Sequence, residues 1–204
     1  MKKISFNPWG SMWTSPSKTI KAIIEYNPKY GFFQLASIAF LQAFFFIVAR
    51  KQVTLPINYF LSLVIAIIIS PFIGAILFYI NSFFIYITGK WLKGRASFSH
   101  VLSSYAWSKI PLVIDLIMWF TLFIFIKDPR FFNYSSSISI IFIDIISITT
   151  AIWSLFLLIS SLKTVQGFST LRAIGNIILS FLFLFVILIV LFLFVLLLMS
   201  LFSK

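Results

Sequence analysis

The chain of 204 residues contains no cysteine and a single histidine, His100. Without cysteine it cannot form a disulfide framework, a thiolate nucleophile or a cysteine-type zinc site. Acidic residues are also scarce, because the chain has only Glu25, Asp115, Asp128 and Asp144. Four carboxylates and one imidazole are too few for a metal cluster or a carboxylate cage. The sequence therefore predicts no metal and no cofactor, and it favours a protein that is not an enzyme.

Charged residues of either sign are rare, whereas apolar residues are abundant. Charged residues make up 10% of the chain and apolar residues 61%, and the mean hydropathy is +1.10. A soluble domain carries about 25% charged residues and does not tolerate large exposed apolar patches. Disorder is excluded because 27 phenylalanines are far too many for a disordered chain. The composition therefore predicts an all-α integral membrane protein.

Five apolar runs predict a bundle of five transmembrane helices. We expect residues 1–31 to form a cytoplasmic amphipathic arm and residues 32–204 to form the membrane domain. A helix rises about 1.5 Å per residue, so a run of about 20 apolar residues crosses a hydrocarbon core of roughly 30 Å. The expected spans are about 32–49, 57–88, 108–126, 138–162 and 173–202.

The second run, residues 57–88, is too long for one upright span and too short for two. Pro71 stands in its middle, where it removes one backbone hydrogen bond and bends a helix. We expect one tilted, bent helix, with a re-entrant hairpin as the alternative. Pro71 itself marks either an ordinary kink or a broken helix that lines a substrate site.

The basic residues lie between the apolar runs and indicate the topology. The formal net charge is +12, which in a soluble protein suggests nucleic acid, but here headgroup contact is the better explanation, and no nucleic-acid partner is expected. One set of connections carries Lys2, Lys3, Lys18, Lys21, Lys29, Lys90, Lys93, Arg95, Lys109, Lys163 and Arg172. The other set carries Arg50, Lys51, Lys127, Arg130 and Lys204. The positive-inside rule therefore predicts a cytoplasmic N-terminus and a C-terminus outside.

Two short amphipathic helices are expected on the cytoplasmic side. Ser15 and Pro16 suit the start of a helix that ends at Asn27-Pro28 and places Ile20, Ile23 and Ile24 on one face. This pattern favours an interfacial helix that anchors the arm, with a partner-docking helix as the alternative. The expected interfacial anchors are Trp9, Trp13, Lys18, Lys21 and Trp91.

Ser97 suits the start of the second amphipathic helix. Phe98, Val101, Leu102 and Tyr105 then follow the spacing of one helix face, so we expect them to pack on the membrane surface or on the bundle. His100 falls on the opposite, polar face and is interpreted as a solvated histidine.

Two aspartates lie inside expected spans, and an intramembrane carboxylate is a functional candidate by default. Counting from the ends of their runs places Asp115 and Asp144 at different depths, about 13 Å apart, so no shared site is expected. Each can form an interhelical hydrogen bond, couple to an ion or proton, or reach towards the interface. Polar residues suited to packing between helices are Ser70, Asn81, Ser82, Ser147, Thr149, Thr150 and Asn176.

Several stretches resemble the Yip1-domain family of membrane proteins. They are Trp13-Thr14-Ser15-Pro16, Tyr105-Ala106-Trp107-Ser108-Lys109-Ile110-Pro111, Ile152-Trp153-Ser154 and Gly167-Phe168-Ser169-Thr170-Leu171-Arg172-Ala173-Ile174. The resemblance covers nearly the whole chain and implies five transmembrane helices with a cytoplasmic N-terminus. It adds Trp107, Lys109 and Pro111 to the candidate functional residues.

Eukaryotic members of this family are associated with Rab GTPases and vesicle trafficking. Their Asp-Leu-Tyr-Gly-Pro stretch and long cytoplasmic N-terminal domain are absent here, so Rab binding is not expected. The chain is more similar to shorter bacterial members, which implies a multi-pass protein of the bacterial cytoplasmic (inner) membrane.

The leading functional prediction is a membrane-organising or protein-interaction factor. Its expected partners are membrane lipids, other membrane or cytoplasmic proteins and further copies of itself. The alternative is a small transporter or channel subunit that uses Asp115, Asp144 and the break at Pro71.

Overall fold

The computed structural model describes residues 7–51, 59–125 and 138–202, and these ranges contain helices and short connections but no strand. Lys2, Lys3, Lys127, Asp128, Arg130 and Lys204 lie outside the described residues. The helices are α1 (Pro8–Thr14), α2 (Pro16–Tyr26), α3 (Phe32–Lys51), α4 (Tyr59–Trp91), α5 (Phe98–Ser108), α6 (Leu112–Phe125), α7 (Ile138–Gln166) and α8 (Thr170–Phe202). The prediction of an all-α protein is therefore confirmed.

Several helices have the length and apolarity that a membrane span requires. Phe60–Trp91, Ile141–Gln166 and Thr170–Ser200 each qualify alone, and α5 with α6 makes a fourth candidate if the pair is counted as one bent span. The apolar part of α3, Phe32–Val48, is a shorter helix. The chain is thus a multi-pass membrane protein by helix length and composition, while the count of five spans stays a prediction.

The structure interrupts the expected span 108–126 near its start. The structure ends α5 at Ser108 and begins α6 at Leu112, and the two helices are bent by 43° relative to each other. Pro111 explains the break, because proline lacks an N–H and disfavours helical geometry at the residue before it.

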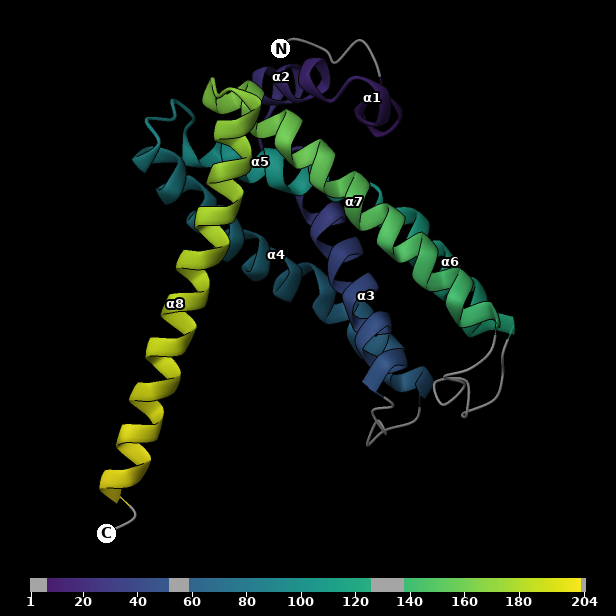
Figure 1. Ribbon diagram of the computed structural model, residues 1–204. Helices are drawn as coiled ribbons and strands as arrows, with labels where there is room; N and C mark the ends of the chain where they lie inside the picture. Colours follow the sequence, from purple (N-terminus) through teal and green to yellow (C-terminus); the bar gives the residue numbers. More distant parts are fainter. Residues whose placement is uncertain (1–6, 52–58, 126–137, 203–204) are drawn as a thin grey trace.

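Figure 1 shows α1 and α2 lying across one end of the molecule, close to α5. From this end α3, α4, α6 and α7 extend as the main bundle, while α8 diverges from α7. Contacts join α3 to α4 and α6, and α7 to α2, α5 and α6, whereas α8 contacts α4 and α7. No residue in the most apolar stretch of α8 is buried within the described protein, so its distal half projects away from the bundle.

The helix α4 is continuous through Pro71, which favours the single-helix prediction over the re-entrant hairpin. A residue other than proline at this position would donate its N–H to the carbonyl of Ile67, four residues earlier. The hydroxyl of Ser70 takes that role, since its Oγ donates to the Ile67 carbonyl oxygen over 2.8 Å. Ser70 is 2% exposed, so this bond satisfies a carbonyl that water does not reach.

Gly74, one turn after Pro71, sets the closest approach of α4 to α3. A Cβ atom at this position would overlap the backbone carbonyl of Ala36. The two helices therefore meet backbone to backbone at a pair of small residues, which is how transmembrane helices gain close packing. Pro71 and Gly74 together belong to a helix crossing, and the structure gives this stretch a packing role.

The isoleucine face of α2 in the N-terminal arm packs on the rest of the protein. Ile20 and Ile23 of α2 are both 0% exposed and join a core cluster with Trp107 and Leu157. The apolar stripe that we expected at the membrane interface therefore covers α5 and α7. A stripe of isoleucines fits lipid and an apolar protein surface equally well, and its sequence cannot distinguish them.

The sequence analysis missed α1. Its signal is Asn7-Pro8, because the Asn7 side chain accepts a hydrogen bond from Trp9 N over 3.0 Å and Pro8 stands at the first helical position. Ser15 and Asn27 bound α2 as expected, although the Ser15 side chain makes no capping bond.

Candidate functional site

Asp115 lies at the centre of the bundle and is 0% exposed. Its carboxylate accepts one hydrogen bond from Gln42 Nε2 over 2.6 Å and one from Ser147 Oγ over 2.7 Å. These donors come from α3 and α7, so one α6 side chain joins three helices. The interpretation of Asp115 as an interhelical hydrogen-bonding residue is therefore confirmed, with Ser147 as an expected partner and Gln42 as one that the sequence analysis missed.

Asp144 lies on α7, three residues before Ser147, and is partly exposed. Three residues of helix correspond to about 4.5 Å, and Ser147 contacts Asp115 directly, so the expected depth difference of about 13 Å is wrong. The expected difference assumed that the ends of the two apolar runs lie at opposite surfaces of the membrane, and each depth was counted from such an end. The helices are staggered, which brings the two aspartates to neighbouring levels.

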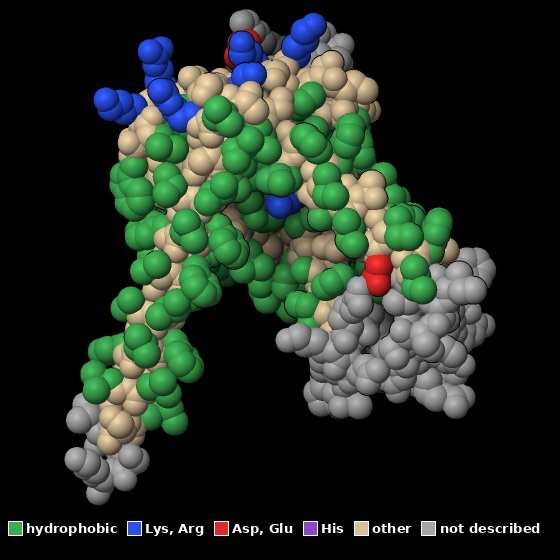
Figure 2. Space-filling model, in the orientation of Figure 1, with side chains coloured by type: hydrophobic (Ala, Val, Ile, Leu, Met, Phe, Trp, Pro, Cys, Tyr) green, Lys and Arg blue, Asp and Glu red, His purple; other side chains and the backbone are tan. Residues whose placement is uncertain are grey.

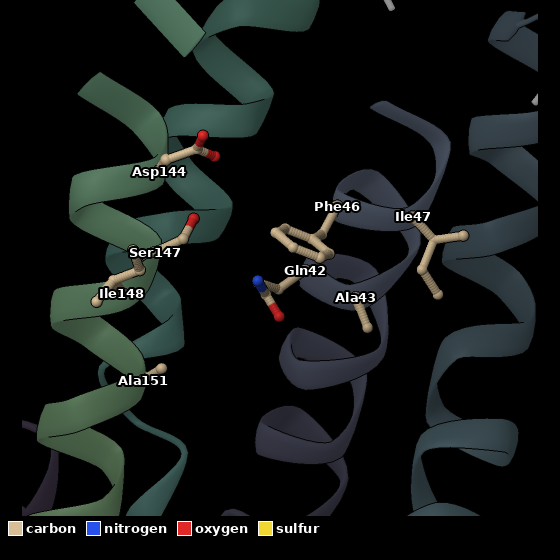
Figure 3. Close-up of a pocket in the computed structure, with 8 residues that line it drawn as sticks. All are labelled: Gln42, Ala43, Phe46, Ile47, Asp144, Ser147, Ile148 and Ala151. Carbon is tan, nitrogen blue, oxygen red and sulfur yellow. The ribbon is translucent and has the colours of Figure 1, made fainter. Parts of the chain in front are cut away.

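A pocket of about 430 Å³ lies beside this hydrogen-bonded group, between α3 and α7. Its polar wall consists of Gln42, Asp144 and Ser147, and the remaining lining residues are Phe46, Ile47, Ile148 and two alanines. In Figure 3, Asp144 and Ser147 point from α7 towards α3, while Gln42 and Phe46 point from α3 towards α7. One wall of the pocket is therefore formed by α3 and the other by α7. Asp144 lies at one end of the α7 wall.

Trp107 is 0% exposed and ties the N-terminal arm to α5. Its indole Nε1 donates to the Tyr30 carbonyl oxygen over 3.0 Å, and its ring stacks on Tyr30 with centroids 6.0 Å apart. Trp9 of α1 meets the same ring edge-on at 5.3 Å. The one hydrogen-bond donor of the indole is therefore used, and its ring contacts two other aromatic rings. The structure gives Trp107 a packing role.

Lys109 and Pro111 lie at the bend between α5 and α6. Lys109 caps the C-terminal end of α5, and its backbone N–H donates to the carbonyls of Ala106 and Trp107. Its ammonium lies 4.9 Å from the centroid of the Tyr105 ring, a cation–π contact with its own helix. The Asp115 carboxylate turns away from Lys109, towards its hydrogen-bond donors on α3 and α7.

A second buried polar group lies where α4, α7 and α8 meet, and the sequence analysis recognised only part of it. Gln166 accepts from Ala96 N over 3.2 Å, and Asn176 accepts from the Thr88 hydroxyl over 2.7 Å. A Cβ atom at Gly89 or Gly94 would overlap the Gln166 amide. The two glycines therefore admit a glutamine that fixes the 92–97 connection to the end of α7.

Among the described residues, exposed cations gather at the end that carries α1 and α2. Figure 2 shows most of the visible Lys and Arg side chains there, above a largely apolar flank. The exposed members are Lys18, Lys21, Lys29, Lys90, Lys93, Arg95, Lys163 and Arg172, which we call the basic face. The acidic residue in these segments is Glu25.

The expected interfacial anchors are divided between the surface and the packed arm. Lys18 and Lys21 are exposed on α2, and Trp91 is 58% exposed at the end of α4. Trp9 and Trp13 are partly buried against the core cluster of the arm. Membrane anchoring by these residues stays a prediction.

Two places in the described part of the chain bring charged side chains to a cavity or to the surface. Within the described ranges, no group of three or more His, Asp or Glu residues could hold a metal ion. His100 is partly exposed on α5, and its backbone N–H donates to the Ser97 cap over 3.4 Å. Asp115 is held by two donors, which leaves the pocket beside Asp144 and the basic face as the two candidate sites.

One of three comparisons with known proteins gave a match. Neither the curated proteins nor the solved structures gave a match to this chain. The family model described as the Yip1 domain matches residues 9–202, from α1 to the end of α8. This match covers the packed arm, the aspartate site and the basic face together, and the chain therefore belongs to the Yip1 domain family.

Proposed function

We propose that this Yip1 domain protein is a non-enzymatic membrane protein that organises partners through its basic face. In this proposal five helices cross the cytoplasmic membrane of a bacterium, with the N-terminus in the cytoplasm and the C-terminus outside. Its partners are lipids, other membrane or cytoplasmic proteins, and further copies of the chain.

The basic face is the observation that carries this proposal. Eight exposed cations come from four parts of the chain, namely α2, the turn after it, residues 90–95, and the last turn of α7 with the first turn of α8. They gather at one end because the arm folds back on α5 and α7. Such a surface attracts acidic protein segments and anionic headgroups, and its sign fits the cytoplasmic side.

Photo-crosslinking in living cells tests whether the basic face contacts a protein. Leu171, which is 82% exposed beside Arg172, carries the crosslinker, and Phe192 on the distal half of α8, 62% exposed, is the matched control. We expect a reproducible protein adduct from position 171 and none of that size from position 192. The double variant Arg95→Glu and Arg172→Glu should abolish the adduct, since the contact depends on charge.

Adducts with lipid alone at both positions would contradict the proposal. An adduct at position 171 that survives the double charge reversal would contradict it as well, because the contact would then not depend on the basic face. Comparable membrane levels of each variant, measured by immunoblot, serve as the expression control.

The second candidate function is a small transporter or channel subunit. The pocket beside Asp144 favours it, because a carboxylate on a cavity wall within a helix bundle is a common feature of ion and proton pathways. Proton flux into proteoliposomes, followed with a trapped pH-sensitive dye, provides the test. In this case Asp144→Asn abolishes flux in a folded protein, and equal flux in the variant and the native chain contradicts the role of Asp144.

A further inference from the structure

The pocket between α3 and α7 combines one carboxylate with an apolar wall. Its volume is about 430 Å³, which is in the range of small-molecule sites. Gln42 and Ser147 direct hydrogen bonds to Asp115, so these two donors are used within the protein. Asp144 is the ionisable residue among those that line the pocket, and Figure 3 shows it pointing across the space towards α3.

The size of the pocket argues against a bare metal ion. A calcium ion requires six to eight oxygen ligands at about 2.3–2.6 Å, which means a tight shell of carboxylates and carbonyls. Here the polar lining consists of one carboxylate, one amide and one hydroxyl, in a space far larger than an ion. The described residues also contain no cluster of three or more metal-binding side chains.

The apolar lining fits an organic body next to a positive charge. Phe46, Ile47 and Ile148 supply apolar surface on both sides, and Figure 3 shows the Phe46 ring pointing towards α7 near the level of Ser147, one turn from Asp144. A carboxylate together with an aromatic face is a favourable environment for an organic ammonium group. A neutral apolar molecule would gain from the walls but not from Asp144.

We propose that the pocket between α3 and α7 binds a small organic cation, namely an amine or quaternary ammonium group that carries an apolar body. The ammonium group lies against Asp144, and the apolar body lies between Phe46 and Ile148. This proposal concerns binding alone, so it holds independently of transport and of protein contacts at the basic face.

Equilibrium dialysis with the full chain in phosphatidylcholine nanodiscs tests this proposal. The probe is 4-phenylbutylamine, and its neutral counterpart 4-phenylbutanol has the same apolar body. Empty nanodiscs give the background for partition into lipid. We expect saturable binding of the amine, with an affinity about ten-fold higher than that of the alcohol.

Variants of Asp144 separate charge recognition from folding. Asp144→Asn should lower the amine affinity about ten-fold and leave the alcohol unchanged, whereas Asp144→Glu should keep the preference for the amine. Ile148→Trp should reduce binding of both probes because the indole fills the pocket. Elution of each variant as a single species of native size shows that it folds.

Equal binding of the amine and the alcohol would overturn the proposal, because the pocket would then be an apolar groove for lipid chains. An amine affinity that is unchanged in Asp144→Asn, or the absence of saturable binding to the native chain, would overturn it too. None of these results depends on proton flux or on adducts at the basic face, so the outcomes remain distinguishable from those of the proposed functions.

Discussion

Asp115 is a buried residue whose main effect is on helix association. Its carboxylate accepts from Gln42 and Ser147, so it connects α6 with α3 and α7. Interhelical hydrogen bonds of this kind contribute about 0.6 to 2 kcal/mol each in membranes. The buried Asp115 carboxylate therefore stabilises the bundle, because Gln42 and Ser147 would otherwise lie unpaired in an apolar environment.

Replacing Asp115 by leucine should lower the free energy of unfolding by about 1–3 kcal/mol, since both donors lose their acceptor. Asp115→Asn should cost less, because the asparagine keeps one acceptor oxygen for Ser147. Unfolding by SDS in mixed micelles, followed by circular dichroism, measures both effects. Equal stability of the leucine variant and the native chain would show that the two hydrogen bonds contribute nothing.

Gly31 and Gly167 separate the backbone effect of glycine from its packing effect. Both have positive φ, +72° and +71°, but only Gly31 has a neighbour in the way, since a Cβ there would lie 2.8 Å from the Trp107 ring. Gly167→Ala should cost about 1–2 kcal/mol from backbone strain alone. Gly31→Ala should cost more in the same unfolding assay, and a smaller loss than in Gly167→Ala would contradict the close contact with Trp107.

Among the elements, the crossing of α3 and α4 leaves no room for a Cβ atom at position 74. Gly74→Ala places a methyl group against the Ala36 carbonyl and forces the helices apart, so we expect a loss of about 1–3 kcal/mol. Gly175 in α8 is the matched control, because nothing lies within 4 Å of its Cβ position. Gly175→Ala should be neutral or stabilising by up to about 1 kcal/mol.

Disulfide crosslinking reports on the same crossing in the membrane. Cysteines placed on α3 and α4 near Ala36 and Gly74 should crosslink in the otherwise cysteine-free chain, and Gly74→Ala should slow the reaction. Equal stability of the Gly74 and Gly175 variants would contradict the backbone contact.

The sequence predicted the elements better than their contacts. Hydrophobic runs located α3, α4, α7 and α8, and the Ser97 cap with its apolar stripe located α5, because these signals are local. The break at Pro111 was readable as a proline, but the long apolar run around it favoured one span. Hydropathy also cannot tell whether an apolar face meets lipid or protein, which is why the stripe of α2 was assigned to the membrane.

The sequence predicted Asp115, Asp144 and Ser147 as candidate residues. It did not predict that they would lie close together. Gln42 and Asp115 are 73 positions apart, and only the stagger of α3 against α6 makes them neighbours. Gln166 was overlooked for the same reason, since its partner Ala96 lies in a distant connection. Hydrogen bonds between helices depend on tertiary packing. A single sequence does not show which distant residues this packing makes neighbours.

At the scale of the whole molecule, the arrangement of helix ends gives a testable topology. In Figure 1 the C-terminal ends of α3 and α8 lie away from the end that carries α1 and α2. We expect reporters fused after residues 93 and 168 to lie in the cytoplasm, and reporters fused after residues 51, 130 and 204 to lie outside. This pattern follows from the predicted five spans and from the prediction that the connections richer in cations are cytoplasmic.

A paired alkaline phosphatase and green fluorescent protein series measures each position with opposite readouts. If fusions at Lys204 and at the N-terminus both reported the cytoplasm, the number of spans would be even. In that case the bent pair of α5 and α6 would be the first candidate for an element that enters the bilayer without crossing it.

The length of α8 has a mechanical consequence for the surrounding bilayer. With 33 residues it measures about 50 Å, whereas a hydrocarbon core is about 30 Å thick. No residue in its most apolar stretch is buried against the described protein, so hydrophobic mismatch can be relieved by tilting α8 or by stretching the lipids around it. The angle of α8 against the bundle should therefore follow acyl-chain length, widening in thin membranes and closing in thick ones.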